Sequence, residues 1–198
     1  MQNKKIKEKE FKLLPNSGIL SAPVYKGGEQ PDLSKHEIIK LNSNENPLGP
    51  SKLATDALKN SFEFINNYPS SSHEKLRKAI AKVHAINFEN IICGAGSDEL
   101  ISFICQCFCS TNDEVIYTEH GFAMYKISAL LRGANPVKVL ENERVADVDN
   151  ILKSCNNKTK IIFLANPNNP TGTFLDSSKI KYLLDNLPDT VLMVIDGA

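Results

Sequence analysis

The chain has 198 residues with 23 basic and 23 acidic side chains, so its formal net charge is zero. Apolar residue types make up 41% and charged types 23%, a composition typical of a soluble globular protein with one domain or slightly more. Balanced charge argues against a main role in binding nucleic acid or an acidic membrane surface, and no apolar run reaches the roughly 18 residues of a membrane-spanning helix.

The N-terminus and the cysteines both indicate a cytoplasmic location. The segment Met1–Lys12 is charged throughout and lacks the apolar core of a secretory signal. The five cysteines are odd in number and most lie in apolar runs, as expected of buried, reduced thiols. On a helix Cys107 would face away from Cys105 and Cys109, and no histidine lies nearby, so we predict no metal site.

Residues 1–50 are predicted to form an irregular N-terminal arm or a segment of a small domain. They are rich in Pro, Gly, Asn and Ser and have little apolar periodicity. The run Glu37–Leu41 is the one place in this arm where a short strand is expected.

Helix and strand patterns alternate through residues 51–198, the predicted second domain. Helix starts are indicated by polar N-cap residues ahead of apolar faces, including a capping box of Ser71 and Glu74. Helices are expected to begin near Ser51, Ser71, Ser97, Phe122, Asp147 and Asp176. Strands are expected at 91–93, 114–118, 136–140, 160–165 and 191–195.

The strict alternation predicts an α/β fold with three layers. The strand sequences IIFLA and VLMVI are apolar on both faces, which is typical of a mostly parallel sheet with helices on both faces. The helix at 97–109 is apolar nearly all round after its acidic first turn, so we expect it to be buried. Gly133 is expected to end the helix that begins at Phe122.

Ligands of such sheets bind at the carboxyl ends of the strands, so the residues that follow each strand are the candidate site. After the first predicted strand, Gly94–Asp98 leads directly into a helix, whose first amides could hold a phosphate. The alternative is a plain helix start in which Ser97 is the N-cap and the carboxylates of Asp98 and Glu99 repel anions. The run is not a dinucleotide fingerprint, because Glu99 stands where the third glycine would fall.

Two further strand ends carry polar groups. The run NPNNPTG at 166–172 is expected to form a stiff loop, which could be structural or could hold an asparagine side chain in place. Asp196 ends an apolar strand and therefore needs a cationic partner, either a protonated ring nitrogen of a cofactor or a Lys or Arg. None of the four histidines is expected to be catalytic, although His120 also lies at a strand end.

The same segments resemble the pyridoxal-phosphate-dependent aminotransferases of fold type I. NPNNPTG at 166–172 and VIDGA at 194–198 carry the general resemblance. LNSNENPLGPS at 41–51, NNYPSSS at 66–72, CGAGSDE at 93–99 and EHGFAMY at 119–125 resemble the N-terminal portion of the histidinol-phosphate aminotransferase family, as does GILSAPVYKGGE at 18–29. The resemblance implies that residues 51–198 are part of the large cofactor-binding domain of that family.

The resemblance implies a site for pyridoxal 5'-phosphate. Asp196 would pair with the ring nitrogen, Asn169 would donate to the phenolic oxygen, and Phe122 would stack on the ring, where many family members have Tyr. The amides of Ser97 and Asp98 would hold the phosphate. Other implied contacts are Tyr68, which would reach the phosphate of the partner subunit in a homodimer, and Tyr25 and Asn46, which would lie near the substrate.

The implied reaction is transamination between histidinol phosphate and 2-oxoglutarate, which yields glutamate, in histidine biosynthesis. The Schiff-base lysine of the family follows the motif of Asp196 and lies beyond residue 198, so we expect the chain by itself to be inactive. Gly197 stands where the family usually has Glu. The alternatives are a sister activity, either another aminotransferase or a decarboxylase of phosphorylated amino acids, a non-catalytic truncated remnant, or an unrelated nucleotide-binding domain.

Overall fold

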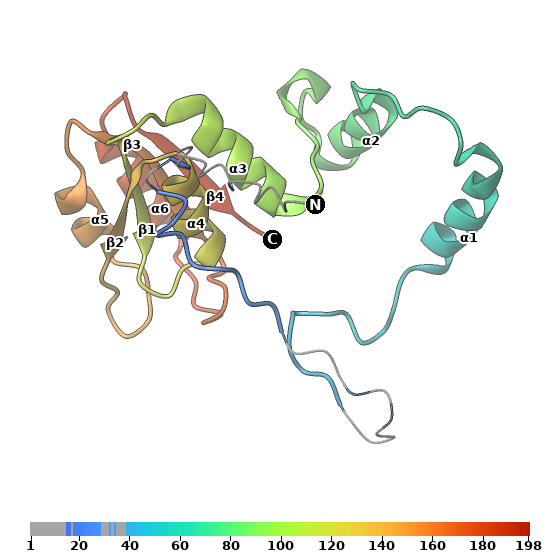
Figure 1. Cartoon of the computed structure of the whole chain (residues 1–198), viewed down its shortest axis with the longest axis horizontal. Helices are drawn as coiled ribbons and strands as arrows, with labels where there is room; N and C mark the ends of the chain where they lie inside the picture. Colours follow the sequence, from blue (N-terminus) through green and yellow to red (C-terminus); the bar gives the residue numbers. More distant parts are fainter. Residues whose placement is uncertain (1–14, 17, 29–31, 33, 35–38) are drawn as a thin grey trace, which may run out of the picture. The chain divides into compact units, whose positions relative to one another are not determined.

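The computed structural model describes residues 15–16, 18–28, 32, 34 and 39–198 (Figure 1). The chain divides into two compact units. One unit combines the segment that ends at Tyr25 with Gly94–Ala198, and the other is Lys26–Cys93. These limits differ from the boundary expected near residue 50, which stays a prediction. The described part of the chain contains no helix that is long and apolar enough to cross a membrane.

The unit Lys26–Cys93 is built from short helices with exposed apolar faces. It contains α1 (Lys52–Ser61), α2 (Glu74–His84) and the 3₁₀ turns η1 (Phe62–Phe64) and η2 (Phe88–Asn90). Neither α1 nor α2 has a buried residue. Arg77 joins α2 to η2, because its Nη2 donates to the Phe88 carbonyl at 2.9 Å and its guanidinium lies over the Phe88 ring.

Two predictions for this unit are wrong, and a third falls partly outside the described residues. Ser51 does precede α1, but the capping box at Ser71 is wrong, because His73 has a φ of 49° and the helix begins only at Glu74. The strand at 91–93 is also wrong: no described strand pairs with it and Ile92 is 76% exposed. An apolar triplet becomes a strand only where a neighbouring strand completes its hydrogen bonds. The strand expected at 37–41 falls partly outside the described residues, and 39–41 form none.

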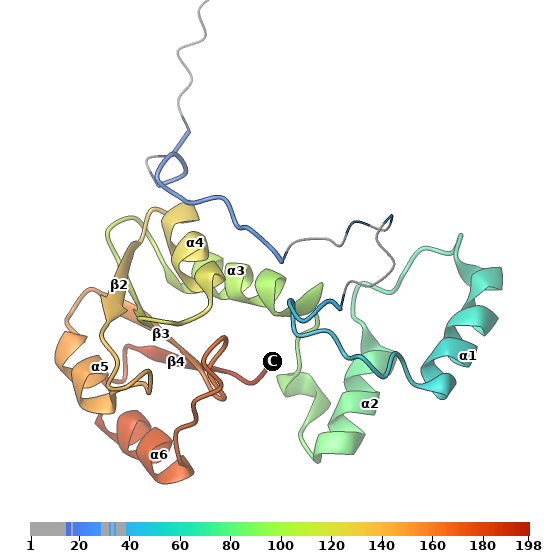
Figure 2. The ribbon, with the colours of Figure 1, turned by 90° about the horizontal axis from the view of Figure 1, so that it is seen from below.

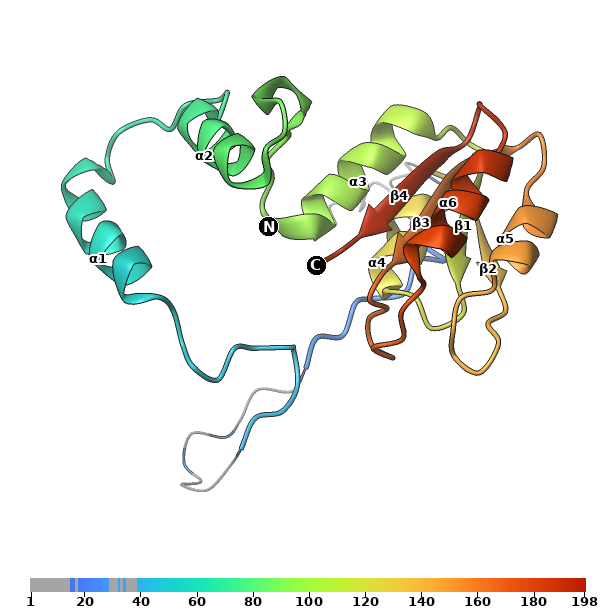
Figure 3. The ribbon, with the colours of Figure 1, turned by 180° about the vertical axis from the view of Figure 1, so that it is seen from behind.

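The second unit is a parallel sheet between two helical layers, as the alternating pattern predicts (Figure 2). Its strands are β1 (Glu114–Thr118), β2 (Asn135–Val139), β3 (Thr159–Ala165) and β4 (Leu192–Asp196), in the order β2-β1-β3-β4. Its helices are α3 (Gly96–Phe108), α4 (Ala123–Leu131), α5 (Val148–Ser154) and α6 (Ser177–Asn186). Helices α3 and α4 cover one face of the sheet, and α5 and α6 cover the other (Figures 2 and 3).

The core lies on both faces of β3, whose side chains alternate between the two layers. Ile161 and Phe163 pack under α3 and α4, whereas Ile162 and Leu164 pack under α5 and α6. All four are almost completely buried. Burial on both faces explains why IIFLA is an unbroken apolar run and not an alternating one.

Helix α3 is less buried than its composition predicts. Only Ile101 and Cys105 are buried, while Phe103 and Phe108 are exposed, because the helix packs on α4 and β3 with one face only. Cys107 is exposed as well, facing away from the buried Cys105 and Cys109, as the helical spacing predicts. The expectation of burial is therefore confirmed only for Cys105 and Cys109, since Cys93 and Cys155 are half-buried and Cys107 is exposed; all five cysteines are unbridged.

Two helix ends in this unit follow the sequence signals, and a third does so only in position. Asp147 caps α5, because its side chain accepts a hydrogen bond from the Asn150 amide at 3.0 Å. Gly133 follows α4 with a φ of 75°, the left-handed conformation that glycine adopts without strain. Asp176 precedes α6 but its side chain makes no capping bond.

Candidate functional site at the carboxyl ends of the strands

Asp196 and the NPNNPTG loop lie next to each other at the carboxyl edge of the sheet. Asp196 is the last residue of β4 and pairs with Ala165, the last residue of β3. The Asn166 amide donates to the Asp196 carbonyl at 2.9 Å, so the loop leaves the sheet directly beside the Asp196 side chain.

Tyr125 holds the carboxylate of Asp196. Its hydroxyl donates to Asp196 Oδ2 at 2.8 Å, and the Ala198 amide donates to Oδ1 at 3.0 Å. The Tyr125 ring is 0% exposed and stacks on Phe163, with 4.8 Å between the ring centroids. Burial, together with the nearby Asp196 carboxylate, raises the pKa of the Tyr125 phenol well above its usual range, so the group remains a neutral donor.

None of the ion pairs among the described residues involves Asp196. The sequence leaves two kinds of partner open for this carboxylate, a cofactor ring nitrogen or a Lys or Arg. The described part of the chain does not supply the Lys or Arg. Asp196 is partly exposed at the sheet edge, and its oxygens retain lone pairs for a further donor.

Phe122 belongs to an aromatic cluster beside Asp196. It stands at the N-cap of α4 and is half-buried. Its ring meets Tyr125 edge-on at 5.9 Å between centroids, and it meets Tyr25 edge-on at 6.0 Å. These contacts connect four residues, Tyr25, Phe122, Tyr125 and Asp196. All of them except Tyr125 are predicted site residues.

Asn169 lies in the loop after β3, with a partly exposed side chain. Its neighbours hold the loop. The Asn166 side chain exchanges two hydrogen bonds with the backbone of Leu175, at 2.8 and 3.1 Å, and the Asn168 amide donates to the Thr173 carbonyl at 2.8 Å. These hydrogen bonds make the loop rigid and therefore hold the backbone of Asn169 in a fixed position.

No side chain caps the first turn of α3. The N-cap is Ala95, which has no side-chain oxygen, and Ser97 lies inside the helix, so the alternative of Ser97 as the N-cap is wrong. The Glu99 carboxylate turns back to accept the Ala95 amide at 2.6 Å. The amides of Ser97 and Asp98 belong to the helix's first turn and lack a capping side chain.

Comparison with known proteins matches residues 36–198 to the family model of aminotransferase class I and II. The chain belongs to this aminotransferase family. It is 50% identical, over 94% of its length, to the histidinol-phosphate aminotransferases of Ruegeria sp. (strain TM1040) and Dinoroseobacter shibae. The chain spans about half the length of these relatives, 51% and 52%.

Solved aminotransferase structures have the same fold. Histidinol-phosphate aminotransferase from Sinorhizobium meliloti, solved in complex with pyridoxal-5'-phosphate, superposes with a TM-score of 0.76 over 79% of this chain and 43% of its own, at 24% identity. Alanine aminotransferase from Pyrococcus furiosus superposes with a TM-score of 0.68 over 74% of this chain and 40% of its own, at 23% identity. At these identities the likeness concerns the fold alone. The expected α/β fold, shared with fold type I aminotransferases, is therefore confirmed.

Two predicted site residues of this aminotransferase chain lie in the other unit, which the structure describes by itself. Tyr68 is 96% exposed. Asn46 uses its side-chain amide in its own turn, where Oδ1 accepts from the Leu48 amide at 3.0 Å and Nδ2 donates to the Gly49 carbonyl at 3.4 Å. The predicted roles of these two residues therefore remain predictions.

Several residues that the aminotransferase fold brings to this edge are not among the predicted site residues. Tyr125 follows Phe122 by three positions, the spacing that places two side chains on one face of a helix, so the signal was present. Asn168 lies in the NPNNPTG run, whereas Glu141 has no such local signal. They lie beside His120, and their contacts are developed below.

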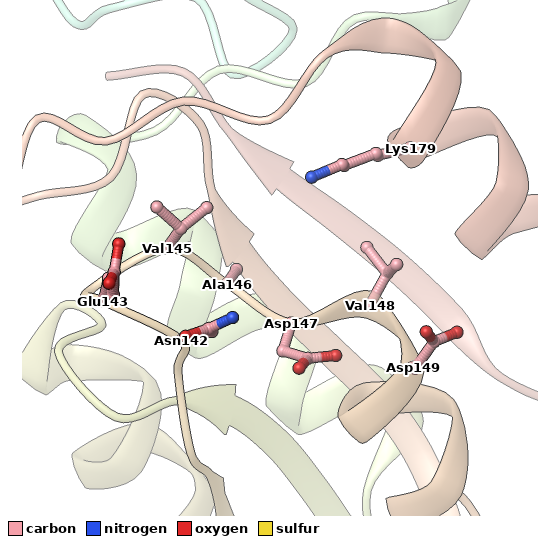
Figure 4. A pocket seen from close by; sticks show the side chains of 8 residues that line it. All are labelled: Asn142, Glu143, Val145, Ala146, Asp147, Val148, Asp149 and Lys179. Atoms are coloured by element: carbon pink, nitrogen blue, oxygen red, sulfur yellow. The ribbon is translucent and has the colours of Figure 1, made fainter.

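A separate cavity of about 420 Å³ opens between the loop after β2 and the start of α6 (Figure 4). Lys179 and several carboxylates line it. Two of these carboxylates are already engaged: Asp147 caps α5, and Asp149 accepts from the Tyr182 hydroxyl at 3.4 Å. The cavity is distinct from the Asp196 site and carries no predicted site residue.

Proposed function

We propose that the complete protein is a pyridoxal-phosphate-dependent histidinol-phosphate aminotransferase. It would exchange amino groups between histidinol phosphate and 2-oxoglutarate, with glutamate as a product, in cytoplasmic histidine biosynthesis. The observation that carries this proposal is the 50% identity to relatives of that name across 94% of the chain. The geometry at the carboxyl edge of the sheet supports it independently.

The residues at this edge fit the chemical groups of pyridoxal 5'-phosphate. The cofactor, when bound, supplies a protonated ring that accepts electrons during amino transfer. A partly exposed carboxylate at Asp196 matches the ring nitrogen, the half-buried aromatic Phe122 matches the ring face, and the first-turn amides at Ser97 and Asp98 match the phosphate. Asn169, on its braced loop, offers a donor for the phenolic oxygen.

Each of these residues has a physical task in the proposed site. The negative charge of Asp196 would keep a proton on the ring nitrogen, and the Tyr125 hydroxyl would hold that carboxylate in one orientation. Phe122, packed between Tyr25 and Tyr125, would limit the ring to one plane and exclude water from one face. Tyr25 would thus contribute to the substrate side of the same aromatic cluster.

The remaining contacts concern substrate and assembly. Asn46 would lie near the substrate, and Tyr68 would bind the phosphate held by the partner subunit of a homodimer. An exposed phenol such as Tyr68 has its hydroxyl available for an intermolecular contact of this kind.

The test is an amino-transfer assay on the complete protein with purified substrates. We expect glutamate to form from histidinol phosphate and 2-oxoglutarate, and Asp196→Asn to lower kcat on the order of 100-fold, a typical effect of removing one preorganised electrostatic contact. Asp185→Asn is the matched control, because that carboxylate pairs with Lys181 on the surface of α6 and should leave the rate unchanged. Two results would contradict the proposal: amino transfer only from a donor other than histidinol phosphate, or no amino transfer from any donor.

A further inference from the structure

Side chains from three loops form a hydrogen-bonded network at the carboxyl edge of the sheet. The loops follow β1, β2 and β3, and the network consists of His120, Glu141, Asn168, Thr171 and Thr173. Two proposed cofactor contacts lie close to it in sequence, Phe122 and Asn169. The network itself has no role in the function proposed above.

Glu141 fixes the position of His120. Its side chain is only 1% exposed, and its Oε1 accepts the His120 backbone amide at 3.0 Å. Its Oε2 lies 2.7 Å from His120 Nδ1. An ionised carboxylate only accepts hydrogen bonds, so Nδ1 carries the hydrogen and the orientation of the imidazole is set. The loop that leads to Phe122 is thereby tied to the loop after β2 at two points.

Asn168 ties the loop after β3 to the same place. It is 8% exposed, and its Nδ2 donates to Thr171 Oγ1 at 2.8 Å and more weakly to the His120 carbonyl at 3.5 Å. Its backbone is held as well, because its amide donates to the Thr173 carbonyl and its carbonyl accepts the Gly172 amide at 2.7 Å. The residue just before Asn169 is thus fixed through both its side chain and its backbone.

The hydrogen bonds beyond Asn168 run in one direction. Thr173 Oγ1 donates its hydrogen to the Arg144 carbonyl at 2.8 Å. The Thr171 hydroxyl must therefore donate to Thr173 across their 2.7 Å contact, which leaves a Thr171 lone pair to accept from Asn168. This series of hydrogen bonds ends on the Arg144 carbonyl, in the loop after β2. The hydroxyl hydrogens of Thr171 and Thr173 are both engaged in it, so neither hydroxyl can rotate freely.

The other amide atom of Asn168 has no such support. Its Oδ1 is buried and meets no hydrogen-bond donor among the described residues. A buried acceptor without a donor is costly, so this position is not optimal for stability. Departures of this kind concentrate at functional sites. The asparagine contributes through its Nδ2 group, which donates to Thr171 Oγ1 and to the His120 carbonyl.

We propose that Asn168 and Thr171, braced by Glu141 through His120, are positioning residues that set the orientation of Asn169 toward the phenolic oxygen of the cofactor. The inference rests on the proposed function and adds to it the residues that hold one of its contacts. Asn168 acts through its neighbour and does not itself touch the ring. Its loss therefore weakens one contact of the ring and leaves the others in place.

The test compares two ligands on the complete apoprotein by calorimetric titration. One ligand is pyridoxal 5'-phosphate, and the other is its 3-deoxy analogue, which lacks the ring hydroxyl. Asn168→Ala and Thr171→Val each remove one link of the network, and Thr171→Val keeps the side-chain shape. We expect each variant to bind pyridoxal phosphate about tenfold more weakly, as the loss of a well-made hydrogen bond predicts, and to bind the analogue within about twofold of the parent protein. Asn169→Ala should give the same pattern.

Asn156→Ala is the matched control. Its side chain also makes two hydrogen bonds, to Glu114 at 2.7 Å and from the Lys158 amide at 2.8 Å, but in the turn that precedes β3. It should lower stability and leave both affinities unchanged. Equal weakening of both ligands by Asn168→Ala and Thr171→Val would show a merely structural role, and unchanged binding of both would show no role; either result overturns the inference. A parent protein that binds neither ligand would instead overturn the proposed function together with this inference.

Discussion

The hydrogen bond from Tyr125 to Asp196 gives the sharpest measurable prediction. Tyr125→Phe removes one hydroxyl and keeps the stack on Phe163, whose ring lies parallel to that of Tyr125 within 3°. A buried hydrogen bond to a charged group contributes about 1.5–3 kcal/mol. Asp196 keeps its second donor, the Ala198 amide, so we expect the free energy of unfolding to fall by about 1.5 kcal/mol, near the lower limit.

The assay is urea unfolding of the apoprotein, followed by circular dichroism at neutral pH. Tyr182→Phe is the matched control, since it removes the same atom from a bond to Asp149 that is 3.4 Å long and lies on the surface. Its effect should stay below about 0.5 kcal/mol. If both variants lose the same amount, the short buried bond has no special value and the role given to Tyr125 is wrong.

The pH dependence of the free energy of unfolding is a second test of the hydrogen bond from Tyr125 to Asp196. Burial and the Asp196 carboxylate raise the pKa of Tyr125, so the folded state retains a proton that the unfolded state releases above about pH 10. Stability contributed by this group is therefore complete below about pH 10 and declines as the pH rises further. The decline in unfolding free energy between pH 10 and 11, measured by urea titration, should be smaller in Tyr125→Phe.

Three further predictions concern the framework of the same unit. Asp147→Ala should lower the free energy of unfolding by about 1 kcal/mol, while Asp176→Ala should cost less, because only Asp147 caps its helix with a side-chain bond; urea unfolding of the two variants compares them. Gly133→Ala should lower the melting temperature, with a cost of about 1–2 kcal/mol, because an alanine is strained at a φ of 75°. A thiol reagent should modify Cys107 in the native protein and leave Cys105 unreacted until urea is added, as mass spectrometry of the labelled peptides would reveal.

The sequence predicts those parts of the fold whose signals are local. The strand 114–118 and the caps at Asp147 and Gly133 follow from patterns within a few residues, and the structure confirms them. The failures have a different origin. Residues 91–93 have the composition of a strand but no described strand beside them, and α3 has the composition of a buried helix but a cover on one face only. Composition reports what a segment can bury, whereas its neighbours decide what it does bury.

The candidate site shows the same division. Asp196 and Phe122 lie at strand ends, which the alternation of helices and strands identifies without a structure. Tyr125 and Asp196 are separated by 71 residues, and His120 and Glu141 by 21, so nothing within a short window connects either pair. Polar partners at such distances come from the topology of the sheet, in which β1 lies between β2 and β3 and β4 follows at the edge.

The sheet nevertheless makes one of these contacts predictable, once the strand order is known. Side chains of a strand alternate between faces with a period of two, so Asp196 points to the same face as Val194. Val194 packs in the cluster that contains Tyr125, whereas Met193 packs in the opposite one. A slip of one residue in the pairing of β4 with β3 would turn Asp196 to the face of α5 and α6, away from the Tyr125 hydroxyl. The register is fixed by the two apolar faces of the sheet, and the position of the carboxylate is a consequence of how the core packs.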